Sequence, residues 1–130
     1  MDLLEKLLSA GDKVLERPAK TVEILRLSKI LGEPFVIKIQ ALTAPEIDEV
    51  NHGGDMDAGL VFTSTISPNF KSEDFRRKMT PASRKTPLTP IEAISHLFIA
   101  GELKQLASII LELSGFGKNS INTFEELKKK

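Results

Sequence analysis

The sequence predicts an α+β domain, in which a small N-terminal antiparallel strand pair is followed by several short packed helices. Three observations predict this class. Two β-branched runs lie near the N-terminus, Thr-x-x-Glu patterns recur after them, and Pro and Gly keep the later segments short. Strands that precede a run of helices are typical of α+β proteins.

The first segment, residues 1–20, carries leucines at helical spacing before Pro18 ends the pattern. These leucines are Leu3, Leu4, Leu7 and Leu8. A helix this short is marginal in water when it is isolated. We therefore expect residues 1–20 to be a flexible or amphipathic segment, which is either docked on something or disordered.

Two strands are expected next, over Thr21–Leu27 and Phe35–Leu42. The second alternates well, because the odd-numbered positions from Phe35 to Ala41 are apolar and two polar residues lie opposite them. The connection Ser28–Pro34 is too long for a tight turn but short enough to join antiparallel neighbours.

Three helices are expected to begin after a capping threonine. In each Thr-x-x-Glu pattern the Thr hydroxyl accepts a hydrogen bond from the Glu N–H, while the Glu side chain reaches back to the Thr N–H. Proline in the first turn supports two of these helices, since its missing N–H is not needed there. The three helices are expected to begin at Ala44, Pro90 and Phe124.

Two more helices are expected, one over Met56–Thr65 with Asp55 as its cap and a short one after Ser72. Gly101 and Gly115 are expected to be left-handed residues at helix C-termini. The folded domain is expected to span residues 21–117, followed by a C-terminal helix or tail over 118–130.

The composition narrows the class of function. The chain has 130 residues, a formal net charge of zero and no cysteine. Zero net charge argues against a nucleic-acid partner, because binding phosphates requires an excess of Lys and Arg. No apolar run is long enough to predict a membrane span. Without cysteine, thiolate metal sites and cysteine nucleophiles are excluded. These features are typical of a soluble intracellular domain.

One group of polar residues favours a different class of function. His52 has acidic neighbours that could bind a metal ion with it, but their spacing matches neither a calcium loop nor a zinc pair. The acids are Glu46, Asp48, Asp55 and Asp57. A small metal-dependent enzyme or regulator therefore stays an alternative. The simpler interpretation is that the glycines after His52 end one helix and Asp55 caps the next.

Two features favour a binding role. One is an apolar stripe at helical spacing, which either packs in its own core or binds a partner. The stripe consists of Leu103, Leu106, Ile110 and Leu113. The other is a basic stretch that either steers a partner or is a solvated face. It includes Arg76, Arg77 and Lys78, and we expect their reversal to leave stability unchanged.

Three stretches carry recognisable motifs. Arg26–Val50 contains an Arg-Leu-Ser segment, a Gly-x-Pro-Phe turn into a strand and an Ala-Leu-Thr-x-x-Glu helix start. Ser67–Phe75 is a second stretch. Thr89–Gly117 has a Leu-Phe-x-x-Gly-Glu turn and then a helix that ends in Leu-Ser-Gly. In their order and spacing these motifs resemble the XkdN-like tail assembly chaperones of phages and prophages in Gram-positive bacteria.

The resemblance implies a protein without catalytic residues or cofactors. Such a protein binds the long tape measure protein, holds it competent while tail tube subunits polymerise, and leaves before the virion is complete. It is expected to act in the cytoplasm of the bacterial host. The tail tube protein and a second copy of the chain are further expected partners, and a structural virion component is an alternative. The candidate partner-binding residues are the four N-terminal leucines, the three basic residues and the apolar stripe.

Overall fold

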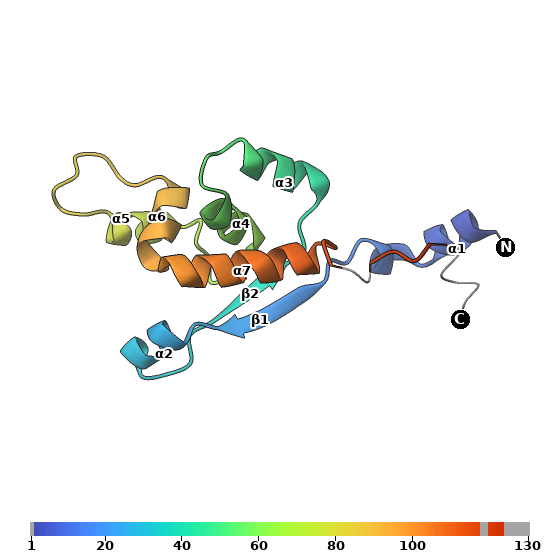
Figure 1. The fold of residues 1–130 in the computed structure, drawn as a ribbon, viewed down its shortest axis with the longest axis horizontal. Coiled ribbons are helices and arrows are strands. Elements are labelled where there is room, and N and C mark those ends of the chain that lie inside the picture. Colours follow the sequence, from blue (N-terminus) through green and yellow to red (C-terminus); the bar gives the residue numbers. More distant parts are fainter. Residues whose placement is uncertain (1, 118–119, 124–130) are drawn as a thin grey trace.

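The computed structural model describes residues 2–117 and 120–123. A small sheet and a layer of helices form the body of the molecule, and an N-terminal arm projects from one end of it (Figure 1). The elements in chain order are α1 (Leu3–Ser9), the 3-10 turn η1 (Gly11–Val14), β1 (Ala19–Glu23), α2 (Leu25–Leu31), β2 (Val36–Gln40), α3 (Ala44–Asn51), α4 (Met56–Ser64), β3 (Thr65–Ser67), α5 (Glu73–Met79), α6 (Pro90–Leu97) and α7 (Ala100–Leu113). The fold is therefore α+β, as the sequence predicts.

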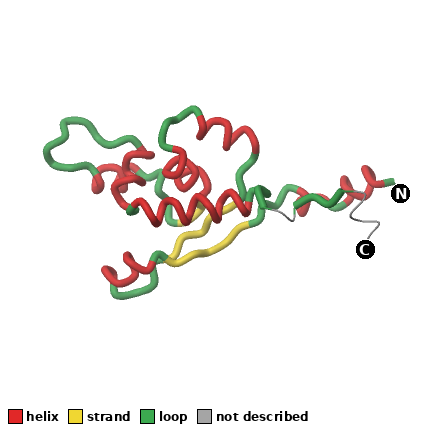
Figure 2. The backbone as a smooth tube through the Cα atoms, in the orientation of Figure 1, coloured by secondary structure: helices red, strands yellow, loops and turns green. Residues whose placement is uncertain are grey.

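The sheet is antiparallel, with strand order β1-β2-β3. Side chains alternate between the two faces of a strand, so Ile37 and Ile39 share one face. Both are fully buried, and Ala41 just after the strand is buried too. Their face packs under α7 and α4, and α7 crosses above the sheet in Figure 2. The alternation expected from Phe35 to Ala41 is confirmed.

The core lies between the sheet and the helices, with α4 at its centre. Leu60 and Val61 of α4 are fully buried, and α4 packs on α3, α6 and α7. The approach of α3 is close: a Cβ on Gly59 would lie 2.9 Å from Cγ1 of Val50. Position 59 therefore needs a residue without a side chain for α3 to pack as it does.

The predicted helix starts after Thr43 and Thr89 are confirmed. In each capping box the Glu carboxylate accepts a hydrogen bond from the backbone N–H of the capping Thr, at 2.8 Å for Glu46 and 2.9 Å for Glu92. Asp55 caps α4 and Ser72 caps α5 through their side chains, also as predicted. The helix expected to begin at Phe124 lies outside the described residues.

The strand predicted over Thr21–Leu27 is wrong beyond Glu23, because the chain turns there into α2. The connection predicted over Ser28–Pro34 holds the second half of this helix. Leu27 is the buried residue of α2, and Gly32 ends the helix with a left-handed φ of 75°. The β-branched residues of Thr21–Leu27 favoured a strand, so α2 was not predicted.

Two further expectations change. The helix predicted over Met56–Thr65 ends at Ser64, and Thr65–Ser67 form the strand β3. This strand pairs with β2, so the sheet has three strands instead of the expected two. Gly101 is not a left-handed end residue but lies in the first turn of α7, which begins after Ile99. Gly115 does have a positive φ, of 95°, just beyond α7, as predicted.

Candidate partner-binding surface

The N-terminal arm carries a set of exposed leucines. No residue of α1 is buried, although Asp2 caps the helix by accepting a hydrogen bond from the N–H of Glu5 at 2.8 Å. The exposed side chains include all four candidates, Leu3, Leu4, Leu7 and Leu8. The arm lies outside the body in Figure 1. Exposed apolar residues gathered on one short segment are typical of an interaction site.

The body of the domain begins before β1. Arg17 donates a hydrogen bond to Glu46 at 2.8 Å, and the carbonyl of Pro18 accepts one from the N–H of Ala41 at 2.8 Å. The expected N-terminal segment, residues 1–20, thus contains both the exposed arm and the first residues attached to the body.

The apolar stripe of α7 belongs to the core. Leu103, Leu106 and Ile110 are buried, and Leu113 is partly buried against the same cluster. Of the two interpretations that the sequence leaves open, packing within the domain is the one the structure shows. These three buried residues offer no free surface to a partner.

The basic residues of α5 differ from one another. Arg76 donates from Nε to the carbonyl of Leu88 at 2.9 Å, so it holds the loop that precedes α6. Arg77 pairs with Glu73 at 3.3 Å while remaining exposed, and Lys78 is exposed with no ion pair among the described residues. The premise that all three are free surface charges therefore does not hold for Arg76, and we now expect its reversal to lower stability.

The structure brings together a surface that the sequence did not indicate. An apolar groove of about 360 Å³ lies between α2 and α5. It is lined by Leu27, Ile30, Leu31, Phe35, Pro68, Asn69, Phe70, Phe75, Met79 and Leu97. We call it the α2–α5 groove. Ile30 and Leu31 are exposed at its α2 wall. Its residues come from separate parts of the chain, so no local pattern could reveal it.

One arginine holds the α2 wall in place. Arg26 donates two hydrogen bonds to the carboxylate of Glu102, at 3.0 and 2.9 Å, and a third to the carbonyl of Leu97 at 2.7 Å. Glu102 also accepts from the N–H of Ile99 at the start of α7. The bonds from Arg26, and secondarily that from Ile99, hold the pKa of Glu102 below its ordinary value although partial burial opposes this.

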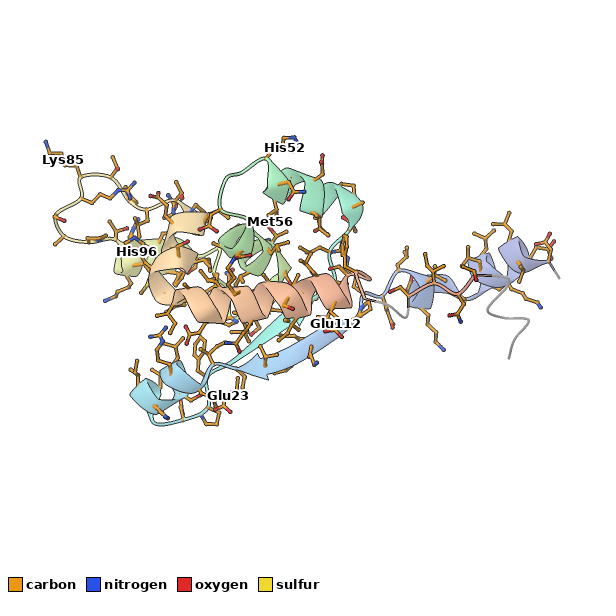
Figure 3. All side chains as sticks on the ribbon, in the orientation of Figure 1. Glu23, His52, Met56, Lys85, His96 and Glu112 are labelled. Atoms are coloured by element: carbon orange, nitrogen blue, oxygen red, sulfur yellow. The ribbon has the colours of Figure 1, made fainter. Side chains whose placement is uncertain are left out.

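The metal alternative receives no geometric support. The His52 side chain is exposed at the end of α3, where Nδ1 lies 2.7 Å from the carbonyl of Asp48. Figure 3 shows His52 and His96 on separate parts of the molecule. Within residues 2–117 and 120–123, no group of three or more acidic or histidine side chains is arranged to hold a metal ion.

Among the described helices, no single one combines the length and apolar character that a membrane span requires, and α6 with α7 reaches it only as a pair, bent by 116° between them.

Fold and surface together define a small α+β domain whose exposed apolar surfaces suit protein binding. The fold is similar to the crystal structure of the protein YqbN, with a TM-score of 0.54 and 21% sequence identity over 76% of this chain and 87% of that one. A search of curated proteins finds no match to this chain. The model of the phage XkdN-like tail assembly chaperone proteins matches residues 4–128. The chain therefore belongs to the XkdN-like tail assembly chaperone family.

Proposed function

We propose that this tail assembly chaperone binds the tape measure protein and keeps it competent for assembly while the tail tube polymerises around it. The family match over residues 4–128 carries the proposal, because it supplies the general role in tail assembly. In this proposal the tape measure protein exposes apolar segments before the tail tube surrounds it, and a chaperone needs apolar surface of its own to cover them. The exposed leucines of α1 and the α2–α5 groove are such surfaces.

In this proposal the protein acts by binding rather than by catalysis and needs no cofactor. It works in the cytoplasm of the bacterial host, and it dissociates before the virion is complete. Contacts with the tail tube protein and with a second copy of the chain are part of the same proposal. A structural virion component is the competing role, and it differs in requiring the protein to remain in finished tails.

A pull-down tests the proposal. The chain, tagged at its C-terminus, is co-expressed with the tape measure protein of the same phage, and retained protein is identified by mass spectrometry. We expect the tape measure protein to be retained, and purified virions to lack the chain. Retention of the tape measure protein together with a stoichiometric presence in virions would favour the structural role instead. Failure to retain it under any salt condition would contradict the proposal.

A further inference from the structure

We propose that the α2–α5 groove binds one turn of an amphipathic helix of the partner, with an acidic residue beside its apolar face that pairs with Lys78. This inference rests on the proposed function, since the tape measure protein is the partner considered.

The lining of the groove calls for an apolar occupant. Among the described residues that line it, Asn69 is the polar one, and its Oδ1 already accepts a hydrogen bond from the N–H of Lys71 at 3.1 Å. Two of the lining aromatic rings contact each other, since the ring of Phe70 lies 5.0 Å from that of Phe75, and Phe70 also lies 5.9 Å from Phe98 of the core, centroid to centroid. Burying a polar side chain here would leave it without a partner.

The geometry favours a helix over an extended segment. An extended peptide binds by adding a strand to a free sheet edge, through hydrogen bonds of its main chain. The lining residues all lie outside the three strands, so they present no strand edge. A helix satisfies its own main chain and offers side chains at i and i+3 or i+4. Such spacing suits walls that are themselves about one turn long, from Leu27 to Leu31 and from Phe75 to Met79.

The positive charge beside the groove indicates that the partner helix carries an acidic residue. Lys78 lies three residues after Phe75 and one before Met79, so it is on the flank of the face of α5 that lines the groove. It has no ion pair among the described residues, whereas its neighbour Arg77 is paired with Glu73. A carboxylate next to the apolar face of the partner helix would complement it.

The test uses two exposed residues of α2 as a matched pair. Ile30 is 68% exposed and lines the groove, while Leu25 is 67% exposed and lies outside it. Ile30→Ser and Leu25→Ser are compared in the co-expression pull-down with the tape measure protein. Each variant is first shown to keep the wild-type melting temperature. We expect Ile30→Ser to retain about tenfold less tape measure protein and Leu25→Ser to retain a wild-type amount. Lys78→Glu is expected to weaken retention at low salt.

A photocrosslinking residue at position 30 then identifies what occupies the groove. We expect an adduct with the tape measure protein, mapped by mass spectrometry to a segment of helical period with an acid beside its apolar face. Equal retention by Ile30→Ser and wild type, an adduct with a second copy of this chain, or an adduct with an extended segment would each overturn the inference while the proposed function stands. If wild type retains no tape measure protein, the proposed function fails and this inference fails with it.

Discussion

Ser64 joins α4 to the central strand through its hydroxyl. The side chain is fully buried, donates to the carbonyl of Gln40 at 2.7 Å and accepts from the N–H of the same residue at 3.0 Å. Ser64→Ala leaves both backbone groups without these bonds, so we expect a loss of about 1–3 kcal/mol in the free energy of unfolding. Urea denaturation measures this, with the exposed Ser108→Ala as control. Equal stabilities of the two variants would contradict the account.

Replacing two helical glycines by alanine is expected to change stability in opposite directions. At Gly59 an added Cβ meets Cγ1 of Val50 at 2.9 Å, so Gly59→Ala is expected to lower the melting temperature by disturbing the contact of α3 with α4. At Gly101 an added Cβ would have no neighbouring atom within 4 Å, and φ is not positive. Gly101→Ala is therefore expected to stabilise the protein by about 0.5–1 kcal/mol. Thermal denaturation of both variants tests the pair. A stabilising Gly59→Ala would show that the helices adjust freely.

At the scale of elements, carboxylates that begin helices are expected to make stability depend on pH. Hydrogen bonds from Arg84, then from the N–H of Thr89, lower the pKa of Glu92 to about 2. The pKa of Glu102 is lowered mainly by Arg26. A carboxyl whose pKa is lower in the folded protein stabilises it above the unfolded pKa, and this contribution is lost as the pH falls through the folded pKa. Stability is therefore expected to fall from about pH 5 to about pH 2.

Glu102→Gln separates the α2 attachment from this general trend. It removes the charged partner of Arg26, so the variant is expected to be less stable than wild type near neutral pH and to lose less stability on acidification. Urea midpoints measured across the acid range give both slopes. Parallel curves for the two proteins would mean that the pair does not titrate as described.

The elements also show how far sequence reasoning reaches. The capping boxes at Thr43 and Thr89 were predictable, because a cap is made by residues three apart in the chain. The turn into α2 was not predictable, because Thr21–Leu27 contains several β-branched residues that favour a strand. The helix that begins there depends on Leu27 packing in the core. The α2–α5 groove could not be predicted from the sequence, because its lining residues come from separate parts of the chain and lie together only in the folded protein.

For the candidate surfaces too, one part could be predicted from the sequence and another part could not. The spacing of Leu103, Leu106 and Ile110 correctly indicated an apolar helix face, but spacing alone does not say whether that face is covered. The fold covers it with the sheet and α4. The leucines of α1 also recur at helical spacing and remain exposed, because the body of the molecule does not extend over the arm.

For the whole molecule, the arm and the body are expected to be energetically independent. Deleting residues 2–15 removes α1 and η1, none of which is buried, and keeps the bonds of Arg17 and Pro18 to the body. The melting temperature is expected to stay at the wild-type value while retention of the tape measure protein falls. Differential scanning calorimetry and the pull-down measure the two effects. A deletion that extends through Pro18 serves as the control, and is expected to destabilise.

Hydrogen exchange tests the same independence without a mutation. Because the arm buries no side chain in the body, its amides are expected to exchange fast in the isolated protein and to become protected when the partner binds. The amides of β2 and α7 are the internal reference, since both elements carry core residues. Strong protection of the arm in the free monomer would contradict this view.

The central claim is that the protein keeps the tape measure protein competent, and the solubility of the tape measure protein tests it most directly. The tape measure protein is produced alone, with the wild-type chain, and with the Ile30→Ser and Leu25→Ser variants, and its soluble fraction is measured after centrifugation. The account predicts that it is mostly insoluble alone, soluble with wild type and with Leu25→Ser, and less soluble with Ile30→Ser. A soluble fraction that is the same with and without the chain would contradict the chaperone function.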